Sequence, residues 1–253
     1  MSNLELIFSF VLLLKNLLNI SNISCTLRGN KMKKSKNSQK IPWATKEAME
    51  QIYKLNLWGG GKVNFYSGDG SHDTTILEPY IKEVVSFLKS FKIPLNIVDL
   101  GCGDFNVGMQ LLEHSEKYTA VDIVEPLIRR NRSVFQADKL HFHCLDIAKD
   151  ALPKGDCAIV RQVLQHLSNK EVKAILSKLS IYKYVLLTEH IPEGLFKPNL
   201  DVISGQGIRL KNNSGIDIFS PPFNLRVKNT LELLSVDVKK WKGRIVTTLL
   251  EMY

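Results

Sequence analysis

The chain has 253 residues, of which 44% are apolar, and a formal net charge of +9. This size suffices for one sizeable α/β core with appendages. Seven basic residues and one acidic residue fall within residues 1–40, so the rest of the chain has the ordinary charge of a soluble domain. The four cysteines show neither Cys-x-x-Cys spacing nor a metal-binding pattern. We therefore expect no metal site, no strongly basic nucleic-acid-binding domain and a reducing, cytoplasmic location.

The first 40 residues differ from the rest. Residues 4–20 are strongly apolar, but their uninterrupted run, residues 6–14, is too short to span a bilayer and lacks the preceding positive charge of a signal peptide. Peripheral membrane contact by residues 4–20, or translation that truly starts at Met32, explains them equally well. Residues 31–40 form a basic linker through which nucleic acid could bind. We expect residues 1–40 to be poorly ordered or not native, and residues 41–253 to form one domain.

Helical spacing of apolar residues predicts a short amphipathic helix over residues 44–57, ended by Trp58 and three glycines. The segment 58–72 is rich in glycine, hydroxyl and aromatic residues, and we expect it to cover the substrate side of the fold. A second helix is predicted to begin at Asp73 or Thr74.

The remaining apolar runs alternate between strand and helix patterns, which is typical of right-handed βαβ crossovers and a parallel sheet. The predicted strands cover residues 93–98, 118–123, 141–147, 156–160 and 182–187, with helices over residues 107–112 and 169–179. Two β-rich runs, residues 233–238 and 244–251, predict a C-terminal antiparallel hairpin. The fold class is therefore α/β, with five parallel strands, a terminal hairpin and helices on both faces.

A glycine turn follows the first strand, in the sequence Asp-Leu-Gly-Cys-Gly-Asp at residues 99–104. Glycine lets the backbone approach a ligand closely, and the N–H groups at the start of the next helix would face that ligand. A dinucleotide fingerprint needs a further glycine where Asn106 stands. The turn thus predicts a nucleotide-type ligand other than a dinucleotide and argues against a nicotinamide oxidoreductase.

Acidic residues end three successive predicted strands: Asp99, Asp122 and Asp146. Ligands of open α/β sheets bind at the carboxyl ends of the strands. Asp122 could accept hydrogen bonds from both ribose hydroxyls. Asp146 could accept one from an adenine amino group while Ile147 packs on the ring.

These motifs resemble class I S-adenosylmethionine-dependent methyltransferases over roughly residues 72–190. Residues 99–104 match motif I, Asp122 matches the ribose acid, and residues 159–167 resemble the segment after strand four in small-molecule methyltransferases. The Trp-Gly-Gly, Ser-Gly-x-Gly-Ser and Cys-Gly-Asp-Phe motifs are similar to little-characterised bacterial members. The resemblance implies a Rossmann-like sheet and S-adenosylmethionine as cofactor. Phe105 stands where the family pattern has a glycine, and we expect it to narrow the pocket.

Residues at the strand ends are the site candidates. Arg161 or Gln162 could hold the methionine carboxylate or an acidic acceptor. Bases that could remove a proton from the acceptor are His166, Glu189 and His190. The predicted cofactor-binding residues are Asp99, Gly101, Cys102, Gly103, Asp122, Ile123, Asp146, Ile147, Arg161 and Gln162.

The predicted function is methyl transfer to a small molecule, a sugar or a lipid-linked intermediate. Segments 58–72 and 191–229 are expected to wall the acceptor pocket, and Ser220-Pro221-Pro222-Phe223 is interpreted as a turn in a substrate loop. Two alternatives remain open: methylation of RNA bound by the basic tail, and a non-catalytic protein that binds S-adenosylmethionine as a scaffold. The sequence does not specify an oligomeric state.

Overall fold

The computed structural model describes residues 42–61 and 63–253. The apolar segment 4–20 and the basic residues 31–40, with the predictions made for them, lie outside the described residues. Within the described part, no helix combines the length and the apolar character needed to cross a bilayer.

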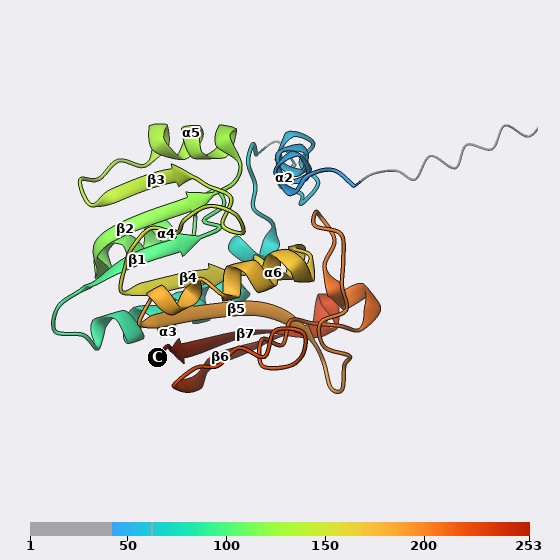
Figure 1. Ribbon diagram of the computed structural model, residues 1–253. Helices are drawn as coiled ribbons and strands as arrows, with labels where there is room; N and C mark the ends of the chain where they lie inside the picture. The colour runs from blue at the N-terminus through green and yellow to red at the C-terminus, as the bar shows by residue number, and fades with distance from the viewer. Residues whose placement is uncertain (1–41, 62) are drawn as a thin grey trace, which may run out of the picture. The chain divides into compact units, whose positions relative to one another are not determined.

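A seven-stranded sheet runs through the molecule in the order β3-β2-β1-β4-β5-β7-β6 (Figure 1). The strands are β1 (Leu95–Leu100), β2 (Ser115–Asp122), β3 (Leu140–Cys144), β4 (Cys157–Arg161), β5 (Tyr184–Pro192), β6 (Asn229–Val238) and β7 (Gly243–Glu251). The first five are mutually parallel, and β7 runs antiparallel to both β5 and β6. This confirms the predicted parallel sheet with a C-terminal antiparallel hairpin.

Helices cover both faces of the sheet. They are α2 (Thr45–Lys54), α3 (Thr74–Lys89), α4 (Gly108–Leu111), α5 (Glu125–Val134) and α6 (Asn169–Leu176). Short 3-10 helices cover Asp69–Ser71 (η1), Leu112–His114 (η2), Leu164–His166 (η3), Leu179–Ile181 (η4), Arg209–Asn212 (η5) and Lys239–Trp241 (η6). Because side chains alternate across a strand, Val98 and Leu100 pack with α2 and α6, whereas Ile97 packs with α3 on the other face.

Local chemistry sets several of these boundaries. The Asp73 carboxylate accepts a hydrogen bond from the backbone of Thr75 and caps α3, and Ser168 caps α6 in the same way. The helix expected over residues 107–112 is shorter, since α4 has only four residues and continues as η2. Four residues separate α4 from Gly103, so the expected role of the helix start at the ligand site was wrong.

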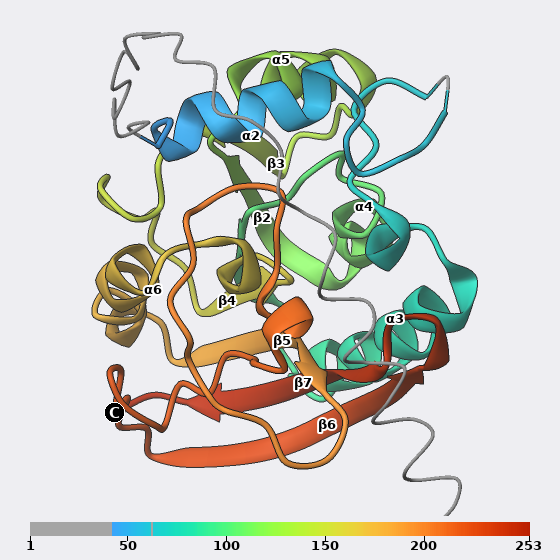
Figure 2. The same cartoon turned by 90° about the vertical axis from the view of Figure 1, so that its right-hand side faces the viewer.

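Strand β5 extends five residues beyond its predicted end, to Pro192, because β7 pairs with it along its whole length. Beyond the carboxyl ends of the parallel strands lie α2 and the long connection between β5 and β6. Figure 2 shows both in front of this edge of the sheet. They enclose the space in which the site lies.

Candidate functional site

A cavity of about 780 Å³ lies at the carboxyl ends of the parallel strands. Its volume falls within the roughly 300–1,000 Å³ of ligand pockets. The glycine turn and the ends of β2 and β3 line one end. The end of β5, η5 and the β6–β7 turn line the other.

Most of the predicted site residues meet here. The cavity is lined by Gly101, Cys102, Gly103, Asp122, Ile123, Asp146, Ile147, Arg161, Gln162, His166 and His190. Asp99 and Glu189 are not part of the lining.

The glycine turn and Asp122 form one unit. Gly101 and Gly103 have φ values of +92° and +54°, in the region that favours glycine. The Gly103 N–H donates to Asp122 Oδ2 (3.1 Å), and the Val124 N–H donates to Asp122 Oδ1 (3.0 Å). Burial raises the pKa of Asp122 to about 6, although these N–H groups favour the carboxylate. The carboxylate therefore fixes the turn while facing the cavity.

Asp99 lies inside β1 rather than after it, on the face packed against α3. Its Oδ2 accepts a hydrogen bond from the Tyr118 hydroxyl (3.0 Å). Burial raises the pKa of Asp99 to about 7. Its place in the structure is thus beneath the glycine turn.

The end of β3 supplies a mixed polar and apolar wall. The Ala148 N–H and the Lys149 ammonium donate to the two Asp146 oxygens at 3.0 and 2.7 Å. Ile147 is 9% exposed and belongs to the core cluster that continues into the cavity wall. An aromatic base could pack against this wall.

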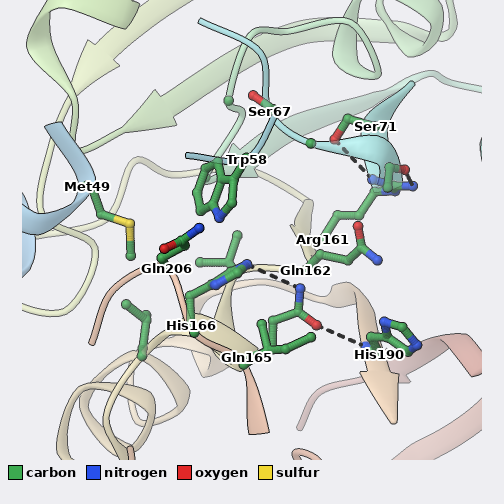
Figure 3. A pocket seen from close by; sticks show the side chains of 18 of the residues that line it. Met49, Trp58, Ser67, Ser71, Arg161, Gln162, Gln165, His166, His190 and Gln206 are labelled. Atoms are coloured by element: carbon green, nitrogen blue, oxygen red, sulfur yellow. Dashed lines mark hydrogen bonds between the residues drawn. The ribbon is translucent and has the colours of Figure 1, made fainter. Parts of the chain in front are cut away.

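Arg161 brings a half-buried positive charge to the cavity (Figure 3). Its guanidinium donates to Gly70 O (2.5 Å) and Ser71 Oγ (3.5 Å), and it lies over the Tyr80 ring. Its Nε has no hydrogen-bond partner, and no carboxylate of the described residues lies within ion-pair distance. Burial lowers the pKa of Arg161 from its usual value. This site therefore favours an incoming anion.

Two histidines are linked through an amide (Figure 3). Gln165 Nε2 lies 3.3 Å from the His166 ring nitrogen Nε2, and Gln165 Oε1 accepts from the backbone N–H of His190 at 3.3 Å. The Trp58 ring lies 5.1 Å from the His166 ring. Burial lowers the pKa of each histidine to about 4. Both imidazoles are therefore neutral at physiological pH.

Glu189 lies on the opposite face of β5 from His190, as strand alternation requires. Its two carboxylate oxygens accept the N–H groups of Leu164 and Gln165, each at 3.0 Å. Burial raises the pKa of Glu189 to about 8. The residue thus holds the loop of residues 162–168, which we call the post-β4 loop.

Arg209, for which the sequence carries no motif, holds the same loop from the other side. This side chain is 1% exposed. It donates to the backbone oxygens of Leu164 (3.2 Å), Gln165 (3.1 Å) and Leu167 (2.7 Å). The post-β4 loop is therefore clamped through its N–H groups by Glu189 and through its carbonyls by Arg209.

Asp104 anchors the segment that covers the glycine turn, residues 63–72, which we call the strap. The Ser67 N–H donates to Asp104 Oδ2 (2.9 Å), and the Asp104 N–H donates to Ser67 Oγ (2.8 Å). His72 Nε2 lies 2.6 Å from Asp104 Oδ2. The acid after Gly-x-Gly was part of the recognised motif, but nothing in the sequence indicated this role.

Two expectations were wrong. Phe105 is fully buried among Tyr118, Phe135 and Phe142, and it does not line the cavity. Phe105 stands where the family pattern has a glycine and has a φ of +66°, but its side chain does not narrow the cavity. Residues 220–223 do not line the cavity either, because Asn199 binds the carbonyls of Ser220 and Pro221, and Phe223 packs against the core.

The depressed pKa of His190 predicts acid sensitivity. The unfolded chain binds a proton here below about pH 6.5, but the native state does so only near pH 4. The unfolded state therefore binds more protons, and stability falls as the pH drops from 6.5 to 4, by about 2–3 kcal/mol. Urea unfolding at pH 7 and pH 4 should show that His190→Gln removes this part of the loss. The exposed His141→Gln variant is the control, and equal losses in both variants would contradict the assignment.

Comparisons with known proteins agree with this geometry. Residues 98–182 match the family model described as a methyltransferase domain. Magnesium protoporphyrin IX methyltransferase from Synechocystis PCC 6803, solved with bound S-adenosylmethionine (SAM), is 17% identical to this chain, with a TM-score of 0.52. The superposition covers 83% of this chain and 98% of that enzyme. The N-methyltransferase NodS from Bradyrhizobium japonicum WM9, solved with S-adenosylhomocysteine, is 10% identical with a TM-score of 0.58, covering 80% and 98%. The N-terminal domain of EvdMO1 with SAH bound is 13% identical with a TM-score of 0.55, covering 84% and 98%. No curated protein matches the chain.

Proposed function

We propose that this chain transfers a methyl group from S-adenosylmethionine to a small-molecule acceptor. Residues 98–182 match a methyltransferase domain, and the chain has the fold of class I methyltransferases. The observation that carries the proposal is the Asp122 carboxylate. It is fixed to the Gly-x-Gly turn and faces one end of a cavity with room for a second ligand.

The residues at that end fit the cofactor. Asp122 has lone pairs left to accept the ribose hydroxyls, and the backbone of Gly101–Gly103, which lines the cavity, would admit the methionine part. Ile123 and Ile147 would enclose the adenine ring, with Asp146 at its edge. The Arg161 guanidinium, with a buried Nε that has no hydrogen-bond partner, would bind the methionine carboxylate beside Gln162.

The other end would hold the acceptor. When bound, the cofactor would supply an electrophilic methyl group for a lone pair of the acceptor. An acceptor that carries a proton must lose it, and the neutral imidazole of His190 or His166 would take it. Glu189, whose oxygens both bind the post-β4 loop, would position these residues.

The size of the cavity, about 780 Å³, supports a small acceptor. Its walls come from α2, the strap, the post-β4 loop, η5 and the β6–β7 turn. The similar structures named above include a magnesium protoporphyrin IX methyltransferase and an N-methyltransferase. A sugar or a lipid-linked intermediate stays a prediction for this chain.

Calorimetric titration of the full chain with S-adenosylhomocysteine tests the proposal, with NAD as the control ligand. We expect micromolar binding of the first and none of the second, because the turn lacks the dinucleotide glycine. A folded protein, verified by circular dichroism, that does not bind S-adenosylhomocysteine would refute the proposal.

A further inference from the structure

Charge is distributed unevenly along the cavity. The carboxylates that line it at the ends of β2 and β3 and on α6 are Asp122, Asp146 and Glu171. The other charged lining residues are Arg161, which the proposal assigns to the cofactor, and Asp69, Lys211 and Lys242. Lys211 on η5 and Lys242 in the β6–β7 turn therefore line the end where the acceptor would lie, and Asp69 is the one acid not yet assigned among the residues of the cavity lining.

That acid is already neutralised. The Lys240 ammonium lies 2.9 Å from Asp69 Oδ2, and the Tyr66 hydroxyl donates to Asp69 Oδ1 (2.9 Å). The side-chain bond to Lys240 lowers the pKa of Asp69 and keeps it ionised. Among the described residues, neither Lys211 nor Lys242 has an acid within ion-pair distance. This end of the cavity therefore has two uncompensated positive charges.

Both lysines stand on anchored backbone. Lys211 belongs to η5, whose first residue is the buried Arg209 that clamps the post-β4 loop. Lys242 has a φ of +50° in the β6–β7 turn, next to Gly243, which pairs with Pro192. A Cβ on Gly243 would lie 2.9 Å from His190 Nε2, so this turn packs directly against the proposed proton acceptor.

We propose that Lys211 and Lys242 bind an anionic group of the acceptor, a phosphate or a carboxylate. Ammonium groups bind such oxygens through charge-assisted hydrogen bonds. The group would sit at the mouth of the cavity and direct the atom to be methylated toward His190 and the cofactor end. This inference gives the substrate class of the proposed methyltransferase and rests on that proposed function. Anion binding at the two lysines can nevertheless be measured independently of methyl transfer.

The test uses the full chain saturated with S-adenosylhomocysteine, so that Arg161 is covered. Inorganic phosphate, pyrophosphate and succinate are titrated separately and followed by 1H–15N NMR, which detects millimolar affinities. Lys211→Gln and Lys242→Gln should each weaken binding about tenfold, the loss of one charge-assisted hydrogen bond. The exposed Lys197→Gln and Lys239→Gln, which replace lysines near them outside the cavity lining, are the matched controls.

The outcomes are distinct. Stronger binding of the phosphate probes or of succinate identifies the group, provided that the two cavity variants lose it and the controls do not. Binding of S-adenosylhomocysteine without any anion binding, or equal losses in cavity and control variants, overturns the lysine site. Anion binding lost in the cavity variants of a protein that does not bind S-adenosylhomocysteine supports the anion site and refutes the methyltransferase proposal.

Discussion

Replacing Asp122 with alanine is expected to weaken binding of S-adenosylhomocysteine at least a hundredfold. The carboxylate would bind the ribose hydroxyls, and its Oδ2 also holds the Gly103 N–H at 3.1 Å. The variant loses the ribose contacts and releases the turn against which the methionine part lies. Two hydrogen bonds to a charged group contribute about 3 kcal/mol or more, which corresponds to at least a hundredfold in affinity. Calorimetric titration measures the change.

Asp156→Asn is the matched control for this variant. Asp156 also bonds a backbone N–H, that of Asn96 (2.8 Å), but it precedes β4 at the opposite edge of the sheet. The Asp156→Asn variant should bind S-adenosylhomocysteine with the affinity of the unaltered protein. An affinity of Asp122→Ala within fivefold of the unaltered protein would contradict the placement of the ribose.

Arg209→Met is expected to lower the free energy of unfolding by about 3–5 kcal/mol. The guanidinium satisfies backbone oxygens on both sides of it, those of the post-β4 loop and that of Leu200 (2.8 Å). Its loss removes a donor from each of these carbonyls, of which Leu164 O keeps the Leu167 N–H at 3.0 Å. It also leaves Glu189 without the nearby positive charge. Methionine keeps much of the side-chain volume, so the effect measures polar contacts rather than a cavity.

Urea unfolding measures this change, and Arg226→Met is the control, because Arg226 lies in the same connection between β5 and β6 but is exposed. The control should stay within about 0.5 kcal/mol of the unaltered protein. If Arg209→Met lowered the free energy of unfolding by less than about 1 kcal/mol, the contacts of Arg209 with the post-β4 loop would not stabilise the fold.

Site residues could be predicted from the sequence where an acidic residue stands at the end of a recognisable parallel strand. Asp122 and Asp146 follow or end parallel strands, so sheet geometry alone places them at the same edge. Glu189 shows where this reasoning fails. The predicted strand stopped at residue 187 and left Glu189 and His190 together in a loop. Pairing with β7 extends the strand, and alternation then sends only His190 into the cavity.

The residues that the sequence did not reveal act through long-range contacts. Arg209 lies about 40 residues beyond the loop that it clamps, and Asp104 binds a segment that precedes it by 37 residues. Neither residue belongs to a helical or strand pattern in the sequence. Their partners are mostly backbone atoms, which any sequence would provide. Periodicity can assign the elements, but such pairings depend on how the elements come together.

The position of the strap bears on how fast a ligand would leave the cofactor end of the cavity. Asp104 follows the glycine turn directly, so the hydrogen bonds that fasten the strap lie one residue from the backbone that would touch the cofactor. We therefore expect ligand binding at the turn and these hydrogen bonds to stabilise each other by the same free energy. On this expectation, changes at Ser67, which weaken the strap without touching Arg161, would raise the rate of ligand dissociation.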